Sequence, residues 1–304
     1  MNGILVELKK NKTLFLMLIP AVLLVILISY IPMAGLVLAF KNFKYDLGIF
    51  GSPWAGFYNF RFFFISGTGL KVTLNTITYN LVNLATSQVL AITFAVIITE
   101  ISGNVFKKLT QSFIFLPFFI SWVIVGVFAL NIFNYDAGLM NRVLLTLGMN
   151  PINVYGEPWI WRFIIPIFNA WKGVGYVTVI YIAAVTGIDA ECFESADIDG
   201  ANIFQKIWHI TLPSIKGTII IMILFDVGRI LRGNFEMFYQ LIGNNGQLFK
   251  ATDVIDTFVF RSLVTGGDLT MSSAATFYQS FLCFIIIMIV NGIVRRVDPD
   301  KALF

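Results

Sequence analysis

Six long apolar stretches most strongly limit what this chain can fold into. They run roughly over residues 14–40, 72–99, 109–133, 164–186, 217–242 and 274–294. Each is at least as long as the about 20 residues that a helix needs to cross the hydrocarbon core of a bilayer. A segment in hydrocarbon must satisfy its own backbone hydrogen bonds, which a helix does. A membrane β-barrel would show segments of about ten residues with alternating polarity. The stretches therefore predict an all-α, multi-pass membrane protein with six transmembrane helices.

The composition supports the same class. Hydrophobic residues make up 58% of the chain and charged residues 12%, with a mean hydropathy of +0.83, whereas a soluble domain carries about 25% charged residues. The first apolar stretch is longer than the core of a signal peptide and no small-residue cleavage site follows it, so we expect a retained helix. Basic patches with interleaved aromatic residues are absent, so nucleic acid is not an expected partner.

Basic residues near the helix ends indicate the orientation in the membrane. If six helices alternate, one side receives Lys9, Lys10, Lys12, Lys107, Lys108, Lys206, Lys216, Arg295, Arg296 and Lys301. The other side has eight basic residues spread over longer loops. Lys and Arg in short loops favour the cytoplasmic side. We therefore expect a protein of the cell membrane with both termini and the loop at 187–214 in the cytoplasm.

The loops on the opposite side are too short to fold independently. They cover about 42–71, 134–163 and 243–273 and contain no run suited to a core of its own. The chain is therefore predicted to form a single transmembrane domain over 1–304, with its core at about 72–294.

Residues with the chemistry of catalysis or metal binding are scarce. His209, Cys192 and Cys283 have no partners at the spacing of metal ligands. The acidic residues between 189 and 199 do not match a calcium loop. A Gly-x-x-x-x-Gly-Lys-Ser/Thr phosphate loop is absent from the sequence. We expect a protein that is not an enzyme and that binds no metal or cofactor itself.

A polar island at 194–213 interrupts this apolar chain. Asp189 is suited to cap a short helix that ends near Ile198, and Gly200 can stop it in the left-handed conformation. A second short helix is predicted to start at Asn202 and to lie in the membrane interface. Pro213 would then open the fifth membrane helix, where a missing amide costs least. The island therefore predicts two short helices in a loop at about 187–214.

The island resembles the signature of binding-protein-dependent ABC importer permeases. In that family Glu-Ala-Ala, three residues, Gly, nine residues and then Ile-x-Leu-Pro mark a cytoplasmic coupling loop. The residues that match at this spacing are Glu194, Ala196, Gly200, Ile210, Leu212 and Pro213. Ser195 departs from the usual alanine, a small-for-small change. The alternative interpretation is that residues 194–213 form an ordinary solvated loop with no coupling role.

A wider resemblance points to one branch of that family. Residues 197–201, Phe204 and the stretch from Asp253 to Arg261 look like the carbohydrate-uptake branch related to the maltose permeases, especially members assigned to oligosaccharides and polysaccharide fragments. It extends over most of the chain from Asn75 onward, while the first helix is generic.

The resemblance implies a type I ABC importer permease fold and a division of labour. An ABC ATPase on a separate chain would bind ATP and Mg, a second homologous permease would complete the pathway, and an extracellular solute-binding protein would deliver the sugar. The first short helix would dock on the ATPase. The residues expected to serve this coupling are Phe193, Glu194, Ser195, Ala196, Asp199, Gly200, Ile210, Leu212 and Pro213.

Polar residues inside the apolar stretches are candidates for the substrate path, because polar groups are expensive in a bilayer. The second stretch carries Thr76, Asn80, Asn83 and Ser87 on one stripe. Candidates for the path are Asn80, Asn83, Asn169, Trp171, Lys172, Tyr176, Asp226 and Arg229. Bonding between helices is an equal alternative for the stripe and for the fourth stretch. Asp226 and Arg229, three residues apart, could form a structural ion pair or a gate.

Two other functions stay open at this stage. An ion-coupled secondary transporter would need coupling acids at mid-membrane and often an internal repeat, and Asp226 alone fits that poorly. An ABC permease for a solute other than a sugar would use the same fold. The sequence does not indicate which sugar or solute is carried.

Overall fold

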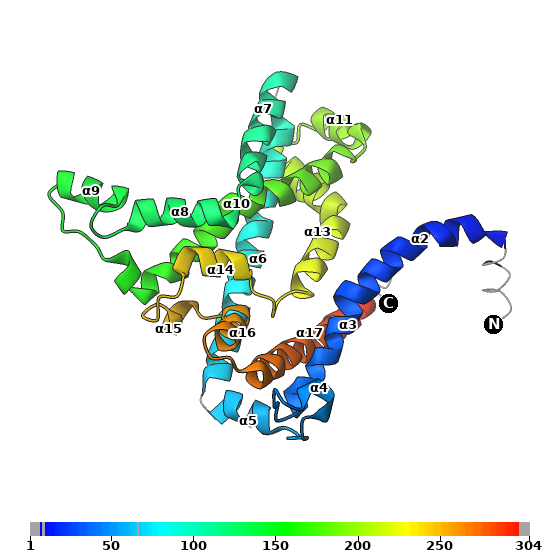
Figure 1. Ribbon diagram of the computed structural model, residues 1–304. Helices are drawn as coiled ribbons and strands as arrows, with labels where there is room; N and C mark the ends of the chain where they lie inside the picture. The colour runs from blue at the N-terminus through cyan, green and yellow to red at the C-terminus, as the bar shows by residue number, and fades with distance from the viewer. Residues whose placement is uncertain (1–6, 8–9, 66, 102, 298–304) are drawn as a thin grey trace. The chain divides into compact units, whose positions relative to one another are not determined.

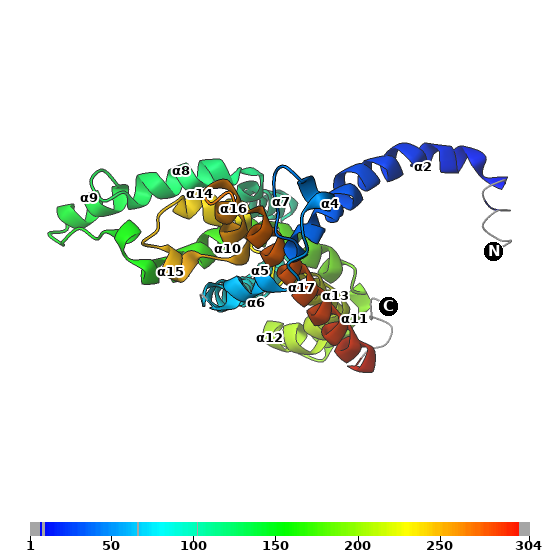
Figure 2. The ribbon, with the colours of Figure 1, turned by 60° about the horizontal axis from the view of Figure 1, so that its bottom comes forward.

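The computed structural model describes residues 7, 10–65, 67–101 and 103–297, so that Lys9 and Lys301 lie outside the described residues. Within these ranges the secondary structure is helical, apart from an isolated antiparallel bridge between Lys41 and Trp54. The α-helices, labelled in Figure 1 except for α12, which is labelled in Figure 2, are α2 (Lys12–Val25), α3 (Ile31–Met33), α4 (Gly48–Gly51), α5 (Tyr58–Ile65), α6 (Thr68–Glu100), α7 (Asn104–Phe115), α8 (Trp122–Phe133), α9 (Leu139–Thr146), α10 (Pro158–Thr186), α11 (Ala190–Ile198), α12 (Ile203–Lys206), α13 (Leu212–Val227), α14 (Phe235–Ile242), α15 (Phe249–Thr252), α16 (Ile255–Val264) and α17 (Leu269–Val297). The predicted all-α class is confirmed.

Five helical segments in the described part of the chain are long and apolar enough to cross a membrane: Lys12–Phe40, Thr68–Glu100, Pro158–Thr186, Ile203–Val227 and Leu269–Arg296. A sixth span results if the bent pair Asn104–Phe119 and Trp122–Phe133 crosses as one unit. The predicted six stretches therefore all correspond to helical segments, but two of them differ in form.

The stretch predicted as continuous over 109–133 is bent by 92°. Pro117 lies in a 3-10 turn, Leu116–Phe119, that closes α7. Ile120 is extended, and the Ser121 hydroxyl then accepts a hydrogen bond from the Ile124 amide at 3.4 Å as the cap of α8. A proline cannot donate within a helix and a capping serine starts a new one, so the chain turns at this point.

The fifth stretch begins and ends earlier than predicted. The short helix α12 begins after Asn202, and Pro213 lies in the first turn of α13, as predicted. The two helices are not separate, however, because a π-helical turn joins them into one span, Ile203–Val227. A π-helical turn, Ile207–Thr211, precedes Pro213, and the Leu212 amide bonds back to the Ile207 carbonyl. This wider turn accommodates a residue that cannot bond to the carbonyl four positions earlier.

The C-terminal end of this helix was also predicted wrongly. The helix stops at Val227, and residues 228–234 form turns and irregular backbone before α14 begins. The predicted stretch at 217–242 is therefore two helices joined by a break. We refer to residues 228–234 as the helix break.

The chain divides into two compact units, one of residues 1–67 and 259–278, the other of residues 68–258 and 279–304. In the larger unit α10 packs along α6, and α8 lies beside α14 in both ribbon views (Figures 1 and 2). Trp161 and Phe238 are fully buried in its core. In the smaller unit the rings of Phe40, Phe60 and Phe277 pack together. A single permease domain with a core at 72–294 stays a prediction.

Candidate functional site

The loop at 187–214 is shaped by backbone bonds that lie within it. The Asp189 carboxylate accepts a hydrogen bond from the Glu191 amide at 3.1 Å and caps α11, as predicted. At the other end Gly200 has φ of +74°. Its amide bonds to the Asp197 carbonyl at 3.1 Å, and the Ala201 amide bonds to the Ala196 carbonyl at 2.9 Å. These two bonds form a Schellman motif, which requires the left-handed conformation that glycine adopts most easily.

A second cap follows immediately and fixes the start of the next helix. The Gln205 amide donates to the Asn202 side chain at 3.0 Å, and the Asn202 amide donates to the Gln205 side chain at 2.7 Å. This reciprocal pair is a capping box. Lys206 forms an ion pair with Asp197 and so ties the new helix to α11. The chain direction therefore reverses between two capped helices.

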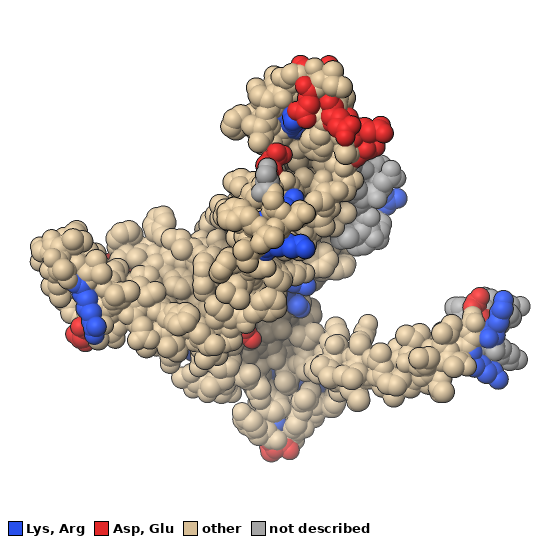
Figure 3. All heavy atoms as spheres, turned by 90° about the horizontal axis from the view of Figure 1, so that it is seen from above, with Lys and Arg blue, Asp and Glu red and all other residues tan. Residues whose placement is uncertain are grey.

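The surface of this loop combines exposed apolar and acidic side chains. Ile198 is 87% exposed, Phe204 70% and Trp208 68%. Acidic side chains gather over α11, which lies beside the α7 label near the top of Figure 1, and they form the red patch at the top of Figure 3. They belong to Asp189, Glu191, Glu194, Asp197 and Asp199. Large exposed apolar side chains within a polar rim are typical of a surface that meets another protein.

The structure brings only part of the predicted coupling set together. Ala196, Asp199, Gly200 and Ile210 line a shallow cavity of ≈ 250 Å³ between α11 and the following helix. Phe193 and Leu212 are half-buried outside it, while Glu194 and Pro213 are exposed. Ser195 donates to the Glu191 carbonyl at 2.9 Å and to the Cys192 carbonyl at 3.2 Å, so its hydroxyl is used within its own helix.

A larger polar cavity lies among α6, α10 and the end of α13. Its volume is ≈ 620 Å³, and we call it the polar cavity. It is lined by Asn80, Asn83, Leu84, Ser87, Asn169, Val177, Asp226, Arg229, Arg232, Gly233 and Asn234. It falls within the size range of about 300–1,000 Å³ that is usual for ligand sites.

Five of the eight predicted path residues line this cavity: Asn80, Asn83, Asn169, Asp226 and Arg229. The other three lie elsewhere. Trp171 borders a small apolar cavity beside α8, and Tyr176 stacks on Phe118 at a ring distance of 4.9 Å. Lys172 donates to the Phe118 carbonyl at 2.8 Å, at the bend between α7 and α8. The fourth helix therefore presents its polar residues on two different faces.

Asp226 and Arg229 are not joined by an ion pair among the contacts of the described residues. Asp226 accepts a hydrogen bond from Gln88 at 2.9 Å instead, and Gln88 in turn accepts one from Tyr181. The Arg229 guanidinium lies over the Phe225 ring, 5.2 Å from its centre. The charge of Arg229 acts favourably on Asp226 through space, but the direct contact to the carboxylate comes from a neutral donor on α6.

The sequence reasoning missed Arg232, Gly233 and Asn234, because it treated the helix break as helix. Side chains from distant elements hold this segment. Asn80 donates to the carbonyls of Ile230 and Arg232 at 2.7 and 3.0 Å. The pair of glycines at 228 and 233, flanking two arginines, was the available sign that the helix ends early.

Asp256 and Gln279 complete this support. The Asp256 carboxylate accepts from the Gly233 amide at 2.6 Å and from the Gln279 side chain at 3.1 Å. Gln279 also donates to the Leu231 carbonyl at 2.7 Å. Burial raises the pKa of Asp256 above its usual range, while the hydrogen bond from Gly233 acts in the opposite direction. The backbone groups released by the break thus find partners on α6, α16 and α17.

One polar atom of the cavity wall has no partner. The Asn83 side-chain oxygen is buried and accepts no hydrogen bond from any protein group. A buried acceptor left unpaired costs about 1–3 kcal/mol. Asn83 therefore carries an unpaired acceptor within the wall of the cavity.

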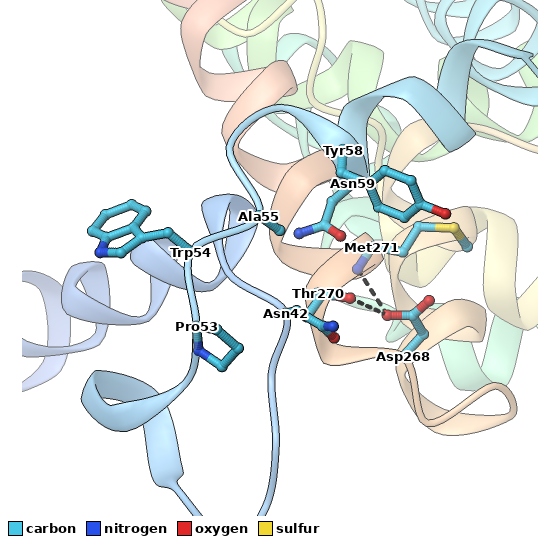
Figure 4. A pocket seen from close by; sticks show the side chains of 9 residues that line it. All are labelled: Asn42, Pro53, Trp54, Ala55, Tyr58, Asn59, Asp268, Thr270 and Met271. Carbon is cyan, nitrogen blue, oxygen red and sulfur yellow. Dashed lines mark hydrogen bonds between the residues drawn. The ribbon is translucent and has the colours of Figure 1, made fainter.

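A second cavity of ≈ 620 Å³ lies in the smaller unit. Figure 4 shows the Asp268 carboxylate facing Thr270 and the amide of Met271, with hydrogen bonds of 2.7 and 2.9 Å, while the Trp54 ring points away. Sequence reasoning did not find this cavity, because its walls come from two distant segments of the chain.

Apolar helices of membrane-spanning length, broken around a polar cavity, define a multi-pass membrane transport protein. The chain belongs to the family of binding-protein-dependent transport system inner membrane components, whose model matches residues 89–302. It is thus a transmembrane permease subunit of a binding-protein-dependent ABC transport system, as the resemblance of the island predicted. This assignment does not support the alternative of an ion-coupled secondary transporter.

Curated relatives extend over nearly the whole chain. The chain is 32% identical to the polygalacturonan/rhamnogalacturonan transport system permease protein YteP of Bacillus subtilis (strain 168), over 98% of this chain and 92% of that protein. It is 31% identical to protein LplB of the same organism, over 96% and 92%. The trehalose/maltose transport system permease protein MalF of Thermococcus litoralis is 29% identical over 74% and 75%.

A solved structure has the same fold. A bacterial ABC transporter involved in the import of the acidic polysaccharide alginate contains a chain that superposes with a TM-score of 0.88 at 29% identity, covering 97% of this chain and 99% of that chain. The alginate transporter in complex with an alginate pentasaccharide-bound periplasmic protein matches with a TM-score of 0.86. The permease fold predicted from the resemblance is therefore confirmed.

Proposed function

We propose that this chain carries a carbohydrate, in the form of an oligosaccharide, into the cell, driven by ATP hydrolysis on a separate chain. The names of the relatives support a sugar as the cargo, since they include permeases for polygalacturonan, trehalose or maltose, and arabinooligosaccharides. The chain itself is not the ATPase, and ATP and Mg bind to the partner subunit.

The observation that carries the coupling mechanism is the form of α11. It is a short helix with caps at both ends, turned back by Gly200 and presenting exposed apolar and acidic side chains. A rigid protrusion of this kind can transmit a push from a docked protein to the helix at Ile203–Val227, because the Asp197–Lys206 ion pair and the tight reversal link the two. In our proposal α11 docks on the ABC ATPase subunit from the cytoplasm.

Three partners follow from this role. A second homologous permease completes the pathway, ABC ATPase subunits bind α11, and an extracellular solute-binding protein delivers the sugar. The solved complex of the alginate transporter with its periplasmic protein supports the last of these. Both termini then lie in the cytoplasm, on the side of α11.

The polar cavity is our candidate for the sugar path. Amide, hydroxyl and guanidinium groups line it, and these suit the hydroxyl groups of a sugar. Trp171, Lys172 and Tyr176 lie outside it. We propose that Lys172 and Tyr176 stabilise the bend between α7 and α8 through Phe118, while Trp171 packs on Phe168 beside α8.

A pair of glycine variants tests the coupling proposal. The complete transporter is reconstituted in proteoliposomes with its ATPase, second permease and solute-binding protein, and ATPase activity is measured with and without loaded binding protein. Gly200→Asp should abolish the stimulation while the variant still inserts, because an L-residue disfavours φ of +74° and alters the reversal of α11.

Gly148→Asp is a matched control. Gly148 has φ of +73°, and it ends α9 with the same pair of bonds, from Gly148 to Leu145 and from Met149 to Leu144. It lies far along the chain from α11 and should leave the stimulation unchanged. If the ATPase activity of Gly200→Asp is stimulated like that of the parent protein, or if both variants lose the stimulation equally, α11 does not transmit the coupling.

A further inference from the structure

We infer that the polar cavity selects a carboxylated oligosaccharide, one that contains uronic acid units, through Arg229 and Arg232. The inference rests on the proposed function of the cavity as the sugar path, and it adds the charge class of the cargo. Three observations within the larger unit carry it: the available donors of the two arginines, the neutral hydrogen-bond partners of the nearby carboxylates, and the amide and hydroxyl side chains in the rest of the lining.

Both arginines have their donors available. Arg229 and Arg232 are exposed, and each lines the polar cavity. Among the contacts of the described residues, neither guanidinium forms an ion pair or a hydrogen bond, and Arg229 is in contact with the Phe225 ring. A guanidinium is always charged and offers five donors in a planar fork that matches a carboxylate. Two such groups in the lining of one cavity are suited to bind carboxylates.

The acidic residues of this region are already engaged. Asp226 takes its hydrogen bond from Gln88, and Asp256 takes two, from the Gly233 amide and the Gln279 side chain. All of these donors are neutral. The charges of Arg229 and Arg232 act on these two carboxylates through space, but the hydrogen bonds come from amides. The N–H donors of both guanidinium groups are therefore not used by the carboxylates.

The remaining wall is suited to hydroxyl groups. Asn80 and Asn83 on α6 contribute amide side chains to the lining, and amides can pair with sugar hydroxyl groups. Ser87 and Asn169 add further polar groups. The volume of ≈ 620 Å³ holds a ligand much larger than a single inorganic anion. Hydroxyl recognition on α6 and carboxylate recognition on the helix break together describe a chain of sugar acids.

The test compares the binding of a charged oligosaccharide with that of its uncharged methyl ester. Fluorescently labelled trigalacturonate and its fully methyl-esterified form differ in charge but not in ring stereochemistry. Binding of each is measured by fluorescence anisotropy to the complete purified transporter without its solute-binding protein, so that the selection made by that protein does not enter. We expect the acid to bind at least about tenfold more tightly than the ester, since charge-assisted bonds are about twice as strong as neutral ones.

Variants assign the preference to the two arginines. Arg229→Gln and Arg232→Gln should each weaken trigalacturonate binding by about tenfold, which corresponds to the loss of one charge-assisted contact, and leave the ester within about twofold. Arg142→Gln is the control, because Arg142 is an exposed arginine on α9 outside the cavity. Added salt should weaken the binding of trigalacturonate and leave the binding of the ester unchanged.

The outcomes separate this inference from the proposed function. If acid and ester bind equally and Asn83→Ala weakens both, the cavity binds sugar but the charge class is wrong. If the acid is preferred and neither arginine variant changes that preference, the assignment to these residues is overturned. If neither saccharide binds and the reconstituted transporter takes up neither, the proposed function fails together with the inference.

Discussion

The segments on either side of the helix at Ile203–Val227 are held in different ways. The chain leaves α11 at Gly200 just before this helix, and it leaves α13 after Val227. At the first end the reversal at Gly200 is closed by hydrogen bonds between residues at most five positions apart, and by an ion pair between residues nine positions apart. At the second end the helix break is held by Asn80, Asp256 and Gln279, which come from three other elements. The first arrangement is local and the second is tertiary.

The glycines at the two ends differ in the same way. Gly200 needs its conformation, since φ is +74° and a Cβ there would meet nothing within 4 Å. Gly233 needs space instead. A Cβ on Gly233 would approach the Asp256 oxygen at 2.9 Å and the Val254 Cγ2 at 3.0 Å. The local turn thus restricts the backbone angles that the residue at 200 can adopt, while the tertiary contacts of the helix break restrict the size of the side chain at 233.

Removing the acceptor at Asp256 should have the largest effect. Asp256→Leu leaves the donors of Gly233 and Gln279 without an acceptor, and each unpaired buried donor costs about 1–3 kcal/mol. We expect a clearly lower melting temperature and faster amide hydrogen exchange at 228–234. Asp256→Asn keeps an acceptor and should restore most of the protection. If Leu and Asn behave alike, side chains do not hold the break.

Paired substitutions at the two glycines should give a crossed result. At Gly200 asparagine should be tolerated better than alanine, because asparagine visits the left-handed region and other L-residues pay about 1–2 kcal/mol there. At Gly233 alanine should be tolerated better than asparagine, because only size matters, and overpacking costs about 1–3 kcal/mol. Thermal melting of the four variants measures this. The same rank order at both positions would refute the distinction.

The capping box should contribute a moderate, local amount. Asn202→Ala removes the acceptor for the Gln205 amide and should cost about 1 kcal/mol, as the loss of a helix cap usually does. Faster hydrogen exchange is expected in the first turn after Asn202 and not at the helix break. Asn202→Asp keeps the cap and serves as the control. Loss of protection at 228–234 in the alanine variant would show that the two ends are coupled.

The ion pair between Lys206 and Asp197 should matter least. Exposed pairs of this kind contribute about 0–1 kcal/mol and are screened by salt. Lys206→Met should therefore change the melting temperature by little, and by less still at high salt, while Gly200 keeps the reversal in place. A destabilisation as large as that of Asp256→Leu would mean that the reversal depends on charge.

Sequence reasoning recovered the site unevenly for the same reason. The cap at Asp189, the end of α11 near Ile198 and the left-handed Gly200 were all predicted, because each depends on residue types a few positions apart. The break after Val227 was not, since the stretch remains apolar and helix-compatible up to Ile242. The polar residues of the fourth helix were predicted as one set, yet Asn169 faces the cavity while Lys172 and Tyr176 face the bend at Phe118.

The sequence by itself determined the all-α membrane class, the family and the shape of the loop that contains α11. Hydrophobic length, capping residues and a glycine with positive φ act through neighbouring backbone groups, and these are present wherever the chain goes. Only the tertiary structure decided where the fifth helix breaks and which side chains meet at the polar cavity. The Asn80 amide meets the Ile230 carbonyl across 150 positions of sequence, and no local pattern encodes a bond of that kind.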